Sequence, residues 1–171
     1  MEESGRIRRG YFVEGLGGSQ FALPGAVDRL RALRDSGGGV IAMAATDPAN
    51  AYGTVLPWPR FEGPPRNHRE ASDFVGTKAD GRMARAAGAY CVIDDGRLVL
   101  YLERGGRSLL TNGEVRLPHL QALIAIATQA GRVELQKVDG LPAMDSPLKS
   151  ALREAGFSQT HRSLIAYGAR S

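Results

Sequence analysis

Three consecutive β-strand patterns in the stretch "GAYCVIDDGRLVLYLERGGRSLLT", residues 88–111, constrain the fold more than any other feature of this chain. The apolar runs are Ala89–Ile93, Leu98–Glu103 and Ser108–Thr111. Asp95-Gly96 and Gly105-Gly106 separate them, and such pairs are typical of tight hairpin turns because glycine adopts positive φ angles. Strands joined by tight turns pair in antiparallel fashion. The sequence therefore predicts a three-stranded antiparallel meander.

Three further segments have the apolar spacing of helices: residues 24–35, 118–130 and 147–155. Each begins at a proline, which is favoured at a first helical position because its missing N–H has no partner there. Glycines 37–39, Gly131 and Gly156 follow the three segments and mark their ends. We expect three helices at these positions.

Shorter β patterns complete the chain: a hairpin of residues 10–13 and 19–24 around the Gly15–Gly18 turn, and strands at 40–45, 132–138 and 163–168. Residues 57–81 are rich in proline and charge, and we expect an irregular surface loop there. Strands outnumber helices. The predicted fold class is α+β, a small antiparallel β-barrel-like domain with about three flanking helices, and residues 1–171 form a single domain.

Composition narrows the function classes. A length of 171 residues suits one domain with a buried core. The single cysteine excludes an internal disulfide framework and favours a reducing, cytoplasmic location. No apolar run approaches the roughly 20 residues that cross a bilayer, so no membrane contact is expected. The three histidines, His68, His119 and His161, are scattered singly, so no metal site is predicted.

The Gly-rich stretch "EGLGG" at residues 14–18 resembles a nucleotide-binding loop only superficially. A Walker loop needs Gly-Lys-Ser/Thr ahead of a helix, so that lysine and hydroxyl reach phosphate and Mg²⁺. Here Ser19 and Gln20 follow Gly18, and a strand pattern comes next. The adjacent carboxylates Asp94 and Asp95 are interpreted as turn formers. The sequence offers no candidate catalytic residue.

Arginines are the candidate functional residues. Lys and Arg total 22 against 18 Asp and Glu, a net charge of +4. A planar guanidinium binds two phosphate oxygens at once, and arginines at strand ends and turns project beyond a sheet. The predicted nucleic-acid-binding residues are Arg6, Arg8, Arg9, Arg82, Arg85, Arg104 and Arg107, placed on one side of the domain. Acidic residues interleave with the basic ones, so a solvated surface remains the alternative.

Three blocks in the same order resemble one family: "GRIRRGYFVEGLGGSQFALPGAVDRLR", "AATDPANAYGTVLPWP" and "GRLVLYLERGGRSLLT". They are similar to the C-terminal β-barrel region of Lhr proteins, the large helicase-related group of DEAD/DEAH-box ATP-dependent DNA helicases. The resemblance extends from the first residues to about Phe157. It implies that residues 1–6 are the tail of a preceding winged helix. The barrel region also resembles that of AlkZ-type DNA glycosylases.

The resemblance implies a function that depends on other domains. In the family, a motor translocates along single-stranded DNA and unwinds duplexes, including RNA–DNA hybrids, during DNA repair. ATP and Mg²⁺ belong to that motor, so we expect no cofactor and no ATPase activity in this chain alone. The implied role is an accessory nucleic-acid-binding or assembly module, with DNA or an RNA–DNA hybrid and the family's motor and winged-helix modules as partners. The alternatives are an oligomerisation scaffold, which would form a homo-oligomer, and a glycosylase-like contribution to base excision.

Overall fold

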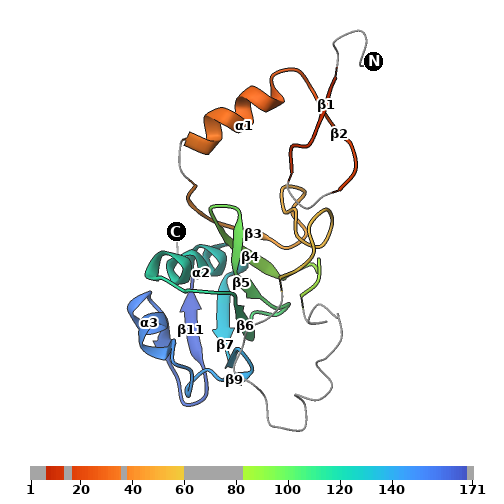
Figure 1. The fold of residues 1–171 in the computed structure, drawn as a ribbon. Helices are drawn as coiled ribbons and strands as arrows, with labels where there is room; N and C mark the ends of the chain where they lie inside the picture. The colour runs from red at the N-terminus through yellow and green to blue at the C-terminus, as the bar shows by residue number, and fades with distance from the viewer. Residues whose placement is uncertain (1–6, 14–16, 36–37, 60–82, 169–171) are drawn as a thin grey trace. The chain divides into compact units, whose positions relative to one another are not determined.

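The chain divides into two units, residues 1–39 and 40–171, in a computed structural model of the protein (Figure 1). The structure describes four ranges: residues 7–13, 17–35, 38–59 and 83–168. The expected loop at 57–81 lies almost entirely outside these ranges, as do residues 1–6.

The first unit contains a hairpin followed by a helix. Strands β1 (Arg8–Gly10) and β2 (Gln20–Ala22) pair in antiparallel fashion, and α1 spans Ala26–Asp35. The hairpin interpretation of the Gly-rich stretch is therefore confirmed, because a strand and not a helix follows the turn. The N–H of Ala26 bonds the carbonyl of Leu23 at 3.0 Å, so α1 begins just after the proline turn that the sequence indicated.

The first strand of the hairpin lies at residues 8–10 instead of the expected 10–13, so it begins and ends earlier than its sequence pattern suggests. The side chain of Gln20 is the cause of the early end. Its Oε1 accepts the N–H groups of Phe12 and Val13 at 2.7 and 2.8 Å, and its Nε2 donates to the carbonyl of Val13 at 3.0 Å. One amide side chain thus satisfies backbone groups that a longer ladder would have paired.

The second unit is built on a six-stranded sheet of order β3-β4-β5-β6-β8-β9. The strands are β3 (Val40–Ala44), β4 (Tyr90–Asp94), β5 (Arg97–Leu102), β6 (Ser108–Thr111), β8 (Lys137–Val138) and β9 (Leu141–Pro142). The predicted meander is confirmed as β4, β5 and β6. Strands β6 and β8 pair in parallel, which departs from the wholly antiparallel expectation. The two edge strands do not pair with each other in the described part of the chain, so the sheet is open and no closed barrel forms there.

The predicted tight turn between β4 and β5 has positive φ at both central residues, 47° at Asp95 and 77° at Gly96. This is the geometry that hairpin twist requires, and it confirms Asp95 as a turn former. A second turn of the same kind, Asp139-Gly140 with φ of 52° and 82°, joins β8 to β9.

The strand predicted at 132–138 is divided between two sheets. Its first part is β7 (Arg132–Leu135), which pairs with β11 (Leu164–Tyr167) in a three-stranded sheet that β10 (Ser158–Gln159) completes. At Gln136 the chain crosses to the larger sheet, because the N–H groups of Gln136 and Lys137 both donate to the carbonyl of Arg107.

Both faces of the larger sheet are buried, which explains the nearly continuous apolar runs of its central strands. Helices α2 (Leu117–Ala130) and α3 (Lys149–Glu154) contribute to the core on one face (Figure 1). That core includes Val92, Leu100, Leu102, Leu109, Leu120, Leu123, Ile126 and Leu152. The α+β class and the three helices are thereby confirmed.

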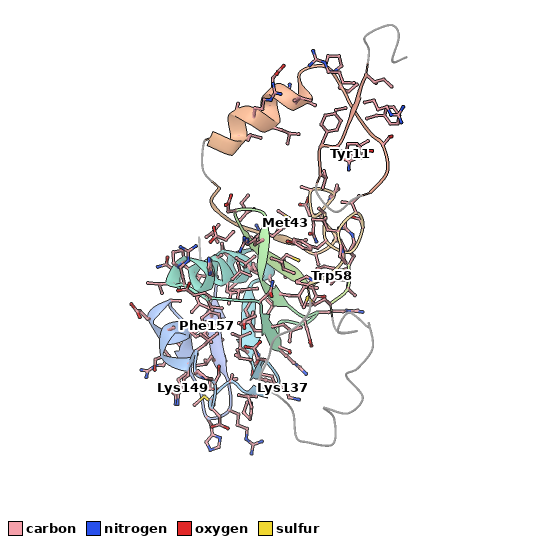
Figure 2. All side chains as sticks on the ribbon, in the orientation of Figure 1. Tyr11, Met43, Trp58, Lys137, Lys149 and Phe157 are labelled. Carbon is pink, nitrogen blue, oxygen red and sulfur yellow. The ribbon has the colours of Figure 1, made fainter. Side chains whose placement is uncertain are left out.

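The other face of the sheet is covered by residues 45–58 and 83–89, packed on Cys91, Tyr101 and Leu110. Trp58, which is labelled in Figure 2, contacts Tyr101 edge to face. Their ring centroids are 5.5 Å apart. A Cβ at Gly53, which has φ of +77°, would lie only 2.7 Å from the indole of Trp58. Glycine is therefore required where this segment passes the ring.

Candidate nucleic-acid interface

The β1–β2 hairpin presents cations on both of its faces. Arg8 pairs with Ala22 and Arg9 with Phe21 in the ladder, and both arginines are exposed. Successive side chains on a strand point to opposite faces, so Arg8 lies on one face and Arg9 on the other. Neither guanidinium forms an ion pair with a carboxylate of the residues that the structure describes.

Arg9 is held in place within the hairpin. Its Nε and one terminal nitrogen donate to Oγ of Ser19 at 3.0 and 2.8 Å. A guanidinium has five N–H donors, so this anchoring leaves three for an anion. The arrangement orients the planar fork and lowers the entropy that Arg9 loses when it binds a phosphate.

Aromatic residues beside these arginines are unusually exposed. Phe21 is 57% exposed and lies directly opposite Arg9. Tyr11, which follows β1 and is labelled in Figure 2, is 81% exposed. The sequence placed Tyr11 next to the arginines but gave no sign that Phe21 would share a face with Arg9. That relationship depends on the ladder register, which a sequence pattern alone leaves open.

In the second unit, Arg85, Arg104 and Arg107 lie at one end of the larger sheet. Tyr90 pairs with Leu102, so the segment before β4 and the turn after β5 meet there. Arg104 and Arg107 are exposed. Exposed Lys137 lies beside them, since its N–H bonds the carbonyl of Arg107. No local sequence pattern marks Lys137, because only the crossing of the chain between sheets brings it to this turn.

Arg85 has a different environment. Its two terminal nitrogens donate to the carbonyls of Thr46, Asp47, Asn50 and Tyr52, at 3.1, 3.0, 2.6 and 3.4 Å. The guanidinium therefore stabilises the conformation of residues 46–52, part of the segment that covers the sheet. A phosphate contact by Arg85 would have to break some of these bonds.

Arg6 and Arg82, the remaining predicted contacts, lie outside the described residues. The structure thus brings Arg104 and Arg107 together in the second unit and places Arg8 and Arg9 on one hairpin in the first.

Three titratable side chains from two distant parts of the sequence lie together where β4 meets α2. They are Asp94, Arg116 and His119. The Nε2 of buried His119 lies 2.9 Å from a carboxylate oxygen of Asp94, and Arg116 pairs with the same oxygen. Nδ1 of His119 accepts the N–H of Arg116 at 3.0 Å, so the proton of the neutral ring is on Nε2 and is donated to Asp94. The hydrogen bond from His119, with the bond and charge of Arg116, lowers the pKa of Asp94. Both ring nitrogens are engaged, so His119 joins the start of α2 to β4 and has no free lone pair for general-base chemistry.

A second carboxylate lines a small hollow. Asp139 accepts the N–H of Thr111 and its hydroxyl, both at 2.8 Å, and burial raises its pKa. The hollow has a volume of about 320 Å³, and Val115, Leu141 and Leu148 form apolar parts of its wall.

Two classes of site are not found in the described part of the chain. No three or more His, Cys, Asp or Glu side chains gather there as a metal site. None of its helices is long and apolar enough to cross a bilayer.

Comparison with known proteins relates the first unit to a defined class of domain. Residues 1–40 match the model of the winged-helix domain of large helicase-related proteins. The match covers more of the chain than the six residues that the resemblance assigned to that domain. The hairpin and the helix of the first unit therefore lie within the residues that match this winged-helix model.

Two full-length relatives match almost the whole chain. A protein of Mycolicibacterium smegmatis described as an Lhr helicase and probable uracil glycosylase is 39% identical over 182 residues, covering 96% of this chain and 11% of the relative. An Escherichia coli protein described as an Lhr helicase/uracil glycosylase is 38% identical over 175 residues, covering 96% of this chain and 10% of the relative. The chain spans about a tenth of the length of these relatives. It belongs to the Lhr family and corresponds to the C-terminal region of its members.

Proposed function

We propose that this chain is an accessory nucleic-acid-binding module of an Lhr-type helicase that acts in DNA repair, and that its arginines contact phosphates without reading bases. The observation that carries the proposal is the β1–β2 hairpin, on which Arg8 and Arg9 are exposed on opposite faces without a carboxylate partner among the described residues. The hairpin lies within the winged-helix match. Cations in this arrangement attract polyanions, which favours DNA or an RNA–DNA hybrid as the ligand.

Arg104, Arg107 and Lys137 form the second part of the proposed contact surface. They are exposed at one turn of the larger sheet. Unwinding would come from a motor on another part of the family's architecture, in the cytoplasm, with ATP and Mg²⁺ bound there. The chain by itself would hold nucleic acid without turning over ATP.

Fluorescence anisotropy with labelled oligonucleotides tests this function. The Arg8→Ala/Arg9→Ala double variant should bind single strands, duplexes and hybrids more weakly, by a similar factor for every sequence. Arg153→Ala/Arg162→Ala is the matched control, because it removes the same charge from two exposed arginines outside the proposed surface. If both double variants lose affinity equally, only net charge matters and the hairpin has no special role. If neither loses affinity, the oligomerisation alternative gains support, and sedimentation analysis of the intact chain tests it.

A glycosylase-like contribution is the second candidate function. Both relatives carry the words uracil glycosylase in their descriptions. In this chain, the hollow beside Asp139 is at the lower end of the range of small-ligand pockets, and it combines an apolar wall with a carboxyl group of raised pKa. Release of uracil from a uracil-containing oligonucleotide by the isolated chain, abolished by Asp139→Asn, would support this candidate. Absence of release by the unsubstituted chain would refute it.

A further inference from the structure

We propose that the hairpin face carrying Arg9 and Phe21 is a base-stacking surface for an unpaired nucleic-acid strand, with Tyr11 as its second ring. This inference rests on the proposed function, since it assigns a ligand class to the same hairpin. Phosphate contacts alone would treat paired and unpaired nucleic acids alike, whereas a stacking surface selects strands whose base faces are accessible.

The ladder register places Arg9 and Phe21 on the same face of the hairpin. Arg9 and Phe21 are direct partners in the β1–β2 pair, so their side chains lie next to each other on one face. Ser19, two residues before Phe21, anchors the guanidinium of Arg9 on that face. The same face therefore carries a planar cation and an aromatic ring, and both groups stack on nucleobases.

At the Gly10–Gln20 end of the ladder, the face opposite Arg9 and Phe21 is covered by the chain itself. The side chain of Gln20 folds over the backbone of residues 12 and 13. A Cβ built at Gly10, the partner of Gln20, would lie 3.0 Å from the ring of Phe12, so that ring covers the Gly10 side of the ribbon. Phe21 and Tyr11 remain 57% and 81% exposed. Two large rings exposed on one small hairpin mark a contact surface, because single exposed apolar residues are common but grouped ones are not.

The charge of the hairpin favours a negatively charged partner. No described residue of the hairpin, in ranges 7–13 and 17–25, is acidic, whereas Arg8 and Arg9 are both exposed. A strand of nucleic acid supplies negative phosphates for these arginines and flat π faces for Phe21 and Tyr11. In a duplex the base faces are already stacked on one another, so only an unpaired strand can use the rings.

The experiment compares three probes bound by the full chain: a 12-nucleotide single strand, the same strand with abasic sites in place of bases, and the matching duplex. Tyr11→Ala and Phe21→Ala should each weaken binding to the base-bearing strand roughly 5- to 150-fold, the range measured for stacking contacts. Both should leave the abasic strand and the duplex nearly unchanged. Phe21→Tyr should restore binding, because it keeps a ring. Leu23→Ala is the matched control, since Leu23 is 67% exposed on the same segment but has no π face. Running the series with DNA and RNA strands identifies which of them is preferred.

Three outcomes would overturn the inference: no loss with either alanine variant, an equal loss on all three probes, or a loss with Leu23→Ala as large as with Phe21→Ala. A change in oligomeric state without a change in oligonucleotide affinity would also overturn it and point to a protein contact at this face. The arginine variants test the phosphate-contact function separately from the stacking surface. If Arg8→Ala/Arg9→Ala leaves the salt dependence unchanged while the ring variants act as expected, the phosphate-contact function fails and the stacking surface stands.

Discussion

Arg9 and Phe21 lie directly opposite each other across the β1–β2 ladder, and the guanidinium of Arg9 donates two hydrogen bonds to Oγ of Ser19. This pairing gives the first unit a face that is both cationic and aromatic. It is a property of the hairpin alone, so it does not depend on how the two units of the chain are arranged.

Arg85 should act mainly in stability. Arg85→Ala removes donors to four backbone carbonyls, and we expect the free energy of unfolding to fall by about 2–4 kcal/mol. Arg85→Lys should recover only part of this loss, because an ammonium cannot span the same carbonyls as a planar fork. Urea unfolding followed by circular dichroism measures both variants. If Arg85→Ala is as stable as the unsubstituted chain but binds DNA more weakly, the contact with phosphate is the main role of this residue.

Cys91 should report on the segment that Arg85 supports. Burial raises the pKa of its thiol to about 12, so at pH 8 almost no thiolate is present. Asn50, whose side chain lies 3.6 Å from the sulfur, belongs to the segment that covers it. We expect slow reaction with a thiol reagent in the native chain, fast reaction in denaturant, and an intermediate rate for Arg85→Ala under native conditions. Equal native rates for the variant and the unsubstituted chain would show that Arg85 does not hold the covering segment closed.

Asp94 should make the stability of the second unit depend on pH. Its pKa is lowered in the folded chain, so its carboxylate contributes stability above its unfolded pKa of about 3.9. That contribution is lost as the pH falls through the lower folded value. Asp94→Asn should therefore lower the midpoint of thermal unfolding at pH 7 and at pH 5, and the difference should shrink below about pH 4. Calorimetry at these pH values measures the effect, and a difference that stays constant down to pH 2.5 would contradict the role of the carboxylate charge.

Gly53→Ala should destabilise the chain for two reasons. Its positive φ strains any residue with a Cβ, and that Cβ would displace the indole of Trp58. Gly113→Ala is the matched control, because Gly113 has φ of +74° but nothing within 4 Å of a built Cβ. We expect a loss of about 1–2 kcal/mol for the control and about 2–4 kcal/mol for Gly53→Ala. Trp58 fluorescence should shift only in the Gly53 variant. Equal losses would mean that the close approach to Trp58 has no energetic weight.

The meander and the three helices could be predicted because their signals are local. Tight turns such as Asp95-Gly96 and the proline and glycine positions near each helix determine where elements begin and end. The division of residues 132–138 between two sheets could not be predicted, because β7 and β8 continue one alternating pattern. Their separation depends on Gln136 and Lys137 bonding a carbonyl from another part of the chain. The expected barrel could not be tested from local sequence signals either, because closure of a sheet depends on long-range pairing between its edge strands.

The sequence predicted which residue types form the candidate site, but it did not predict how these residues are arranged in space. Arg8 and Arg9 stand out by composition, but the partner of Arg9 across the hairpin depends on register, and the early end of β1 depends on the side chain of Gln20. Arg85 resembles the other arginines in sequence. Its four acceptors are backbone carbonyls, which carry no sequence signal.

The salt dependence of single-strand binding by the full chain and by Arg8→Ala/Arg9→Ala tests the central claim most directly. Each phosphate contact releases condensed counterions, so log affinity should fall with log salt by about 0.7 per contact on a single strand. If both arginines contact phosphates, the double variant should bind all sequences more weakly and have a slope flatter by about 1.4. The Arg153→Ala/Arg162→Ala control should keep the slope of the unsubstituted chain. Parallel salt lines for the unsubstituted chain and for Arg8→Ala/Arg9→Ala would contradict the account, because the hairpin arginines would then make no phosphate contact.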